Sequence, residues 1–182
     1  MAFQFRFEER ARKDISMAEA AGSDLLYEFD LISEELVELL EAGLPKGHCP
    51  SEDDAPEGWD SKQIVAHMAE WCEFWRRDVE EGLRRPRITV LGRSALDEDR
   101  SRRIEALSAM PTSELIDRMT LEIGKTAGLL ASLEAKDFAA TVTHLTDGQI
   151  TIDDMVSKHL IAHLGEHLAQ LKELEETPPT QS

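Results

Sequence analysis

The sequence has few positive charges, few cysteines and no long hydrophobic run. Its 182 residues include 20 Lys and Arg against 37 Asp and Glu, a formal net charge of −17, and such acidity repels the phosphates of nucleic acids and anionic lipids. No segment approaches the roughly 18 consecutive apolar residues of a membrane helix, and residues 1–10 lack the apolar core of a signal peptide. Two cysteines, Cys49 and Cys72, are too few for a disulfide scaffold. We therefore expect a cytoplasmic protein with reduced thiols that binds neither nucleic acid nor membrane.

Strand patterning is also scarce, whereas apolar residues recur at helical spacing over several long segments. The length and the hydrophobic fraction of 41% suit one globular domain. Asp60 with Gln63, and Thr151 with Asp154, form capping boxes that mark the starts of helices. Apolar stripes with a three- and four-residue period predict four amphipathic helices, over about residues 23–42, 60–82, 112–133 and 151–174.

These helices divide the chain into three parts. Residues 1–22 form an N-terminal extension with weak helical character, and residues 175–182, which contain two prolines, form a disordered tail. Residues 23–174, with Ser23 as the first cap, form the folded domain. We expect an all-α antiparallel four-helix bundle, because four long amphipathic helices can bury their apolar stripes against one another.

Two connections carry further structure. The connection between the second and third helices is long, and within it Ser94 and Asp97 open a short charged helix; we expect this crossover to pass over one end of the bundle. Asp147 and Gly148 are a tight-turn signal, which indicates a small hairpin before the last helix.

Two histidines lie in the middle of the apolar stripe of the last helix. His163 and His167 are one turn apart and share an arc with Val156, Leu160, Leu171 and Leu174. A polar ring in a buried stripe is unfavourable unless it is satisfied, and two imidazoles at i and i+4 can bind one metal ion. The segment is not a protease H-E-x-x-H motif, because Leu164 follows the first histidine.

A third ligand is available on the second long helix. His67 lies on its apolar side together with Ile64, Met68, Trp71 and Trp75. Three histidines from two helices match a catalytic metal site with one open position. Gln170 lies one turn beyond the last of these histidines and would orient it by a hydrogen bond. His159 lies at the flank of the stripe, and we expect it either next to the metal ligands or at the surface. Trp71 is expected to form part of the pocket wall.

The sequence leaves alternatives to this metal site open. An inward histidine is often a hydrogen-bonded core residue. Imidazole ligands also suit zinc, nickel, copper and iron alike, so the spacing does not name the ion.

Other chemically notable residues have simpler interpretations. Positive charge is concentrated between the second and third helices. We interpret this segment as a solvated, salt-bridged crossover, and the alternative is that its arginines bind an anionic substrate. The residues are Arg84, Arg85, Arg87, Arg93, Arg100, Arg102 and Arg103. Cys72 is expected to be buried and unreactive. Cys49 is expected in a loop, and His144 at the surface near the predicted turn.

The motifs around these histidines resemble those of a known family. The run HLGEHLAQ at residues 163–170 is similar to the H-x-x-x-H-x-x-Q signature of the DinB-like superfamily, and GWDSKQIVAHMAEW at residues 58–71 resembles its first motif. The resemblance extends over about residues 23–174. It implies a four-helix bundle, a histidine triad for nickel or zinc, and often a homodimer.

The resemblance also implies a range of functions. Relatives include metal-dependent thiol-transferases and the N-terminal domain of mycothiol-dependent maleylpyruvate isomerase, which use a low-molecular-weight thiol as cosubstrate. We therefore expect a thiol-dependent transferase or isomerase acting on a small molecule. The alternatives are a metal-dependent hydrolase and a non-catalytic, stress-linked bundle that binds a ligand or partner, since superfamily membership alone does not establish a reaction.

Overall fold

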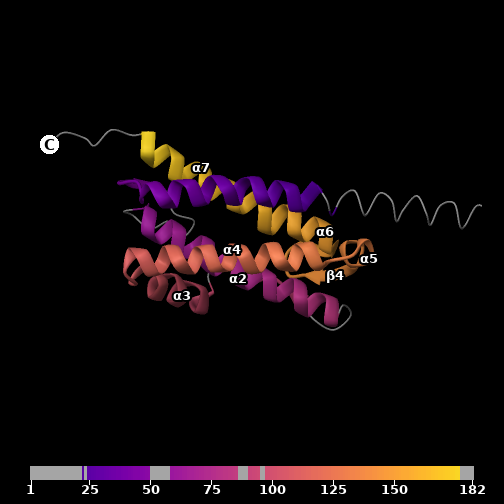
Figure 1. The fold of residues 1–182 in the computed structure, drawn as a ribbon. Coiled ribbons are helices and arrows are strands. Elements are labelled where there is room, and N and C mark those ends of the chain that lie inside the picture. The colour runs from indigo at the N-terminus through magenta and orange to yellow at the C-terminus, as the bar shows by residue number, and fades with distance from the viewer. Residues whose placement is uncertain (1–21, 23, 50–57, 86–89, 95–96, 177–182) are drawn as a thin grey trace, which may run out of the picture.

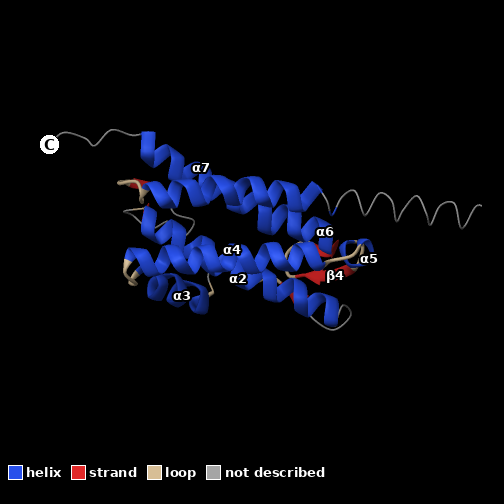
Figure 2. Cartoon of the chain, in the orientation of Figure 1, coloured by secondary structure: helices blue, strands red, loops and turns tan. Residues whose placement is uncertain are grey.

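The computed structural model describes residues 22, 24–49, 58–85, 90–94 and 97–176. The described part contains four long helices (Figure 1): residues 24–42, α2 (Ser61–Arg84), α4 (Thr112–Ser132), and a last helix made of α6 (Ile152–Met155), η1 (Val156–Ile161) and α7 (Ala162–Glu176). Helices dominate and the strands are short (Figure 2). The predicted all-α four-helix bundle is confirmed. The expected helix before residue 22, the cap at Ser23 and the tail beyond Glu176 lie outside the described residues.

The first and last helices run side by side in the same direction (Figure 1). Ile32 lies against Gly165, and Glu35 forms an ion pair with Lys172 at 2.5 Å. Residue numbers thus increase together along the two helices, which makes this pair parallel.

The two middle helices, α2 and α4, are also parallel to each other and run opposite to the first pair (Figure 1). Glu73 pairs with Arg118 at 2.6 Å, and one turn farther along both helices Arg76 pairs with Glu122 at 3.5 Å. Two helices joined in sequence can be parallel only if their connection returns to the starting end.

The connection between α2 and α4 therefore runs back along the bundle, and the expectation that it crosses one end is wrong. It contains β3 (Val90–Leu91), which pairs with the hairpin, and α3 (Glu98–Ser108), which packs on α2. The side chain of Asp97 accepts hydrogen bonds from the backbone N–H groups of Asp99 and Arg100. Asp97 is thus the cap of α3, and Ser94 lies before the helix.

The hairpin predicted around Asp147 is present. β4 (Thr141–His144) and β5 (Gly148–Thr151) are antiparallel, and β3 extends them to a three-stranded sheet by pairing parallel to β4. A second small sheet joins β1 (His48–Cys49) to β2 (Trp59–Asp60), and a short helix, α5 (Ala135–Phe138), precedes β4. The two-residue strands were not predicted, because two residues show no periodicity.

The last helix is not uniformly α-helical, which the sequence pattern did not predict. Thr151 and Asp154 form the expected capping box. Farther on, η1 is a π-helical turn, in which the N–H of Ala162 donates to the carbonyl of Ser157, five residues back. The wider turn changes the rotation between His159 and the residues that follow, and π-turns of this kind are frequent at functional sites.

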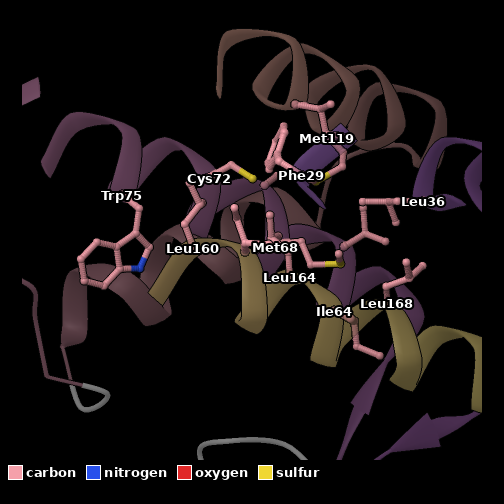
Figure 3. Close-up of a cluster of buried hydrophobic side chains, with 14 of the residues drawn as sticks. Phe29, Leu36, Ile64, Met68, Cys72, Trp75, Met119, Leu160, Leu164 and Leu168 are labelled. Atoms are coloured by element: carbon pink, nitrogen blue, oxygen red, sulfur yellow. The ribbon is translucent and has the colours of Figure 1, made fainter. Parts of the chain in front are cut away.

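The hydrophobic core lies between the four helices (Figure 3). Phe29, Met68, Cys72, Met119 and Leu160 come from all four and are almost completely buried. In the described part of the chain, no helix is long and apolar enough to cross a membrane.

Gly92 follows β3 and packs against His144. Its φ is +86°, and an added Cβ would lie 2.4 Å from His144 Nε2. We expect Gly92→Ala to lower the free energy of unfolding by about 2–3 kcal/mol, because it adds backbone strain to a steric overlap. Urea unfolding followed by circular dichroism measures this.

The matched control is Gly124→Ala in α4, where an added Cβ meets no described atom within 4 Å. Alanine in a helix interior should stabilise the protein by about 0.5–1 kcal/mol. Equal effects of the two substitutions would contradict the role of the contact between Gly92 and His144.

Candidate metal centre

Three histidine rings converge in the interior, one from α2 and two from α7. The Nε2 atom of His163 lies 3.0 Å from the Nε2 of His67 and 3.0 Å from the Nε2 of His167. His67 and His167 are buried, whereas the side chain of His163 retains 15% exposure. The structure thus brings the three predicted ligands together, with His163 between the other two and facing solvent.

Local structure explains this convergence. The capping box of Asp60 and Gln63 starts α2, and this start places His67 on the buried side of the helix. On α7, His163 and His167 are separated by one regular α-helical turn, so their rings project in nearly the same direction. The two helices then bury the three rings between them.

Each histidine of α7 has a polar partner three residues farther along. The Nδ1–H of His167 donates to the side-chain oxygen of Gln170 at 2.8 Å, as the sequence spacing suggested. Glu166, which the sequence analysis did not single out, places a carboxylate oxygen 3.5 Å from Nδ1 of His163. Partners of this kind keep the proton on Nδ1 and leave the lone pair of Nε2 for a ligand.

Two tryptophans wall the triad. Trp59 of β2 packs edge-on against His67, with ring centroids 5.0 Å apart, and Trp71 lies 4.0 Å from the ring of His163. The indole N–H of Trp71 donates to the backbone carbonyl of His159 at 2.6 Å, which fixes the orientation of the ring. The two indoles thus pack against His67 and His163, and the side chain of His163 keeps 15% exposure.

The donor set fits a divalent transition metal. Metal–nitrogen bonds of about 2.0–2.1 Å bring neighbouring nitrogen ligands to about 3 Å from each other, which is the spacing between these Nε2 atoms. The ligand atoms of His67, His163 and His167 all lie within 4.8 Å of one another. Three protein nitrogens leave coordination positions for water or substrate, as in catalytic rather than structural zinc sites.

A family model of the DinB superfamily matches residues 17–171. The chain belongs to the DinB superfamily. This confirms the resemblance that the two histidine motifs indicated. No match was found among curated proteins.

Two solved structures share the fold of this DinB-superfamily chain. YfiT from Bacillus subtilis, described as a probable metal-dependent hydrolase with an unusual four-helix bundle topology, has a TM-score of 0.65 and 18% identity over 84% of this chain and 85% of YfiT. A histidine-to-alanine variant of mycothiol-dependent maleylpyruvate isomerase has a TM-score of 0.61 and 13% identity over 85% of this chain and 65% of that protein. At such low identity, the similarity establishes the fold alone.

His159 does not join the triad, although it precedes His163 by four residues. Its ring stacks on Trp75 at 5.0 Å and on His144 at 4.3 Å, and its Nε2 lies 3.0 Å from Asp147. With η1 π-helical, His159 lies between Trp75 of α2 and the hairpin, whereas His163 and His167 lie beside His67 of α2. His144 was expected at the surface but is buried, since the sheet folds it against Trp75.

The arginine-rich connection is only partly the solvated segment that we expected. Arg84, Arg85 and Arg102 are exposed, but Arg100 is buried and the side chain of Arg93 is only 10% exposed. The guanidinium of Arg93 makes two hydrogen bonds to the carboxylate of Glu70 and lies 3.9 Å from the ring centroid of Phe74. Arg100 is 1% exposed and lies over Trp59 at 5.8 Å. The charge pattern of the sequence did not predict that these two arginines are withdrawn from solvent, because their positions depend on partners distant in the chain.

Neither cysteine is placed as a nucleophile. Cys72 is fully buried, and burial raises the pKa of its thiol to about 12; burial also raises the pKa of Cys49. Since only the thiolate reacts, we expect both thiols to resist iodoacetamide at pH 7.5 in the native protein and to react rapidly in urea. Intact-protein mass spectrometry measures the labelling, and rapid native modification of Cys72 would contradict its burial.

Proposed function

We propose that this protein is a metal-dependent enzyme that activates a low-molecular-weight thiol for transfer to, or isomerisation of, an electrophilic small molecule. The observation that carries the proposal is the convergence of three imidazoles, in which Nε2 of His163 lies 3.0 Å from the Nε2 atoms of His67 and His167 and its side chain keeps 15% exposure. Nickel and zinc are the ions we propose, because both accept three imidazole ligands and keep an open position.

The residues of the chain have distinct tasks in this proposal. A divalent ion at the triad supplies Lewis acidity, which favours the anionic form of a thiol or of water near neutral pH. Gln170 and Glu166 hold the imidazoles in the tautomer that presents Nε2. Trp71 and Trp59 fix the rings from the sides and limit the approach of substrate to the side of His163.

The acid–base groups near the triad favour a thiol over water as the nucleophile. A glutamate general base assists the attack of metal-bound water in zinc proteases, but the residue after His163, where that glutamate would stand, is the buried Leu164. Glu166 is directed at the outer nitrogen of His163 and is largely exposed. A thiol has an ordinary pKa of about 8.5 and ionises with less help.

Hydrolysis is the second candidate. The solved structure of YfiT, which has the same fold, is described as that of a probable metal-dependent hydrolase. The two functions differ in one requirement, since only the first needs an added thiol.

The test is an activity screen of protein reconstituted with nickel or zinc, using a chromogenic aryl halide with and without a cysteine-containing small thiol. Thiol-dependent product formation should fall by at least about 100-fold in His167→Ala, with an unchanged circular dichroism spectrum. Full activity in that variant would overturn the mechanism. Turnover of an activated ester without thiol would instead support hydrolysis.

We also propose a cytoplasmic location and a homodimeric state. Both cysteines are unpaired in the structure, as thiols are in reducing compartments.

Sedimentation velocity at micromolar concentration tests the proposed homodimer, and a single monomeric species would contradict it.

A further inference from the structure

A second cluster of metal-ligand side chains lies on the hairpin side of the triad. His144 comes from the end of β4, Asp147 from the hairpin turn and His159 from η1. One ligand atom from each lies within 4.8 Å of the other two. We propose that these three side chains form a second divalent-cation site, distinct from the histidine triad and independent of the proposed activity.

Asp147 presents one carboxylate oxygen to each imidazole. Its Oδ2 lies 3.0 Å from Nε2 of His159, and its Oδ1 lies 3.8 Å from Nδ1 of His144. The backbone N–H of Asp147 donates to Nδ1 of His144 at 3.3 Å, so this nitrogen carries its lone pair toward the turn. An ion would replace the proton between His159 and Asp147, and at Nδ1 of His144 it would displace the hydrogen bond from Asp147 N–H and the contact with Thr146 Oγ1 at 3.2 Å.

The two imidazoles are already held in place by packing. The rings of His144 and His159 stack at 4.3 Å with an angle of 28°, and Trp75 stacks on His159 at 5.0 Å with an angle of 14°. Nε2 of His144 lies against Gly92, where a side chain would collide with it. Ligands that are oriented before binding lose little entropy when the ion arrives.

The electrostatic environment also suits a cation. Hydrogen bonds, above all from Lys158, hold the pKa of Asp147 below its usual range, and burial lowers the pKa of His144. Asp147 is therefore ionised and His144 neutral at pH 7, which are the metal-binding forms. The Lys158 ammonium lies 2.5 Å from Asp147, but its side chain is 64% exposed. A divalent ion would displace this ammonium, and Lys158 could extend into water.

The ligand set limits the kind of ion. Two imidazoles and one carboxylate suit zinc, cobalt, nickel or iron, whereas calcium and magnesium prefer oxygen ligands. An ion here would connect the hairpin to the last helix at the turn before His163. Trp71 joins the two sites, because it donates to the carbonyl of His159 and packs on His163.

The experiment separates the two sites by mutation. In tag-free His67→Ala/His163→Ala protein, the triad is removed and Co²⁺ is titrated at pH 7.5, followed by its visible absorption and by calorimetry. We expect about one ion to bind, and binding to weaken by more than about tenfold when Asp147→Asn or His159→Gln is added. Lys158→Ala should tighten binding, because it removes the competing ammonium, and His48→Ala, an exposed histidine, should change nothing.

Metal content of the otherwise unchanged protein provides a second measurement if the double variant does not fold. The parent should hold about two Co²⁺ ions and Asp147→Asn about one. No binding in the folded triad variant, or binding that survives both Asp147→Asn and His159→Gln, would overturn the second site. Failure of the thiol-dependent activity would leave these stoichiometries unaffected.

Discussion

Replacing His163 with alanine is expected to empty the triad while the bundle remains folded. His163 would be the central ligand of an ion at the triad, since its Nε2 lies 3.0 Å from both other Nε2 atoms, and its removal leaves two nitrogens on opposite helices. Loss of a direct ligand should cost at least the 10- to 100-fold in affinity that is typical of losing a supporting hydrogen bond. In tag-free Asp147→Asn protein, plasma mass spectrometry should detect about one ion per chain, and almost none once His163→Ala is added.

Two controls make this result specific. His48→Ala removes an exposed histidine of β1 and should keep the full metal content. Gln170→Ala retains all three ligands but removes the hydrogen bond to Nδ1 of His167, so it should weaken binding by about 10- to 100-fold without abolishing it. Metal content equal to the parent in His163→Ala, after reconstitution with nickel or zinc, would show that the three rings are core histidines.

The second large effect, a loss of stability, is expected when the ion pair between the buried Glu70 and the largely buried Arg93 is broken. Glu70 is 1% exposed and Arg93 10%, and the carboxylate accepts hydrogen bonds from both terminal nitrogens of the guanidinium. Glu70→Ala leaves the largely buried guanidinium of Arg93 without the carboxylate that accepts both of its hydrogen bonds. We expect the free energy of unfolding to fall by about 3–5 kcal/mol, measured from urea denaturation curves.

A double variant tests the cause of this loss. Glu70→Leu with Arg93→Met replaces both charges by apolar side chains of similar length, and such replacements are often neutral or stabilising. The double variant should therefore recover most of the stability lost in Glu70→Ala. A decrease of less than about 1 kcal/mol in the free energy of unfolding of Glu70→Ala would contradict this, because it would show that the pair contributes no more than an exposed ion pair.

Local patterns predicted the residues that start helices and face the core. Asp60 with Gln63 and Thr151 with Asp154 form the expected capping boxes, because a cap depends on residues within one turn. The position of His167 in the apolar stripe predicted its burial for the same reason. The turn signal of Asp147 and Gly148 also predicted the hairpin, because these residues carry their turn preference locally.

Long-range packing decided the features that the patterns did not predict. The π-helical turn of η1 gives no sequence signal that we recognised, yet it separates His159 from His163 and assigns them to different clusters. β3 has only two residues, and the return of the connection along the bundle depends on contacts with α2 that are distant in sequence: Gly92 with Asp78, Arg93 with Glu70, and Met110 with Lys62. Parallel alignment of α2 and α4 follows from that return.

By itself, the sequence determined that four amphipathic helices form, that His67, His163 and His167 face inward, and that the motifs belong to the DinB superfamily. These properties depend on residues within a few turns of each other. Only the tertiary structure decided that His67 meets His163 and His167, that Glu70 neutralises Arg93, and that His144, Asp147 and His159 gather beside Trp75. The contacts between separate elements join residues at least 12 positions apart, and helical periodicity carries no information about which distant faces will pack together.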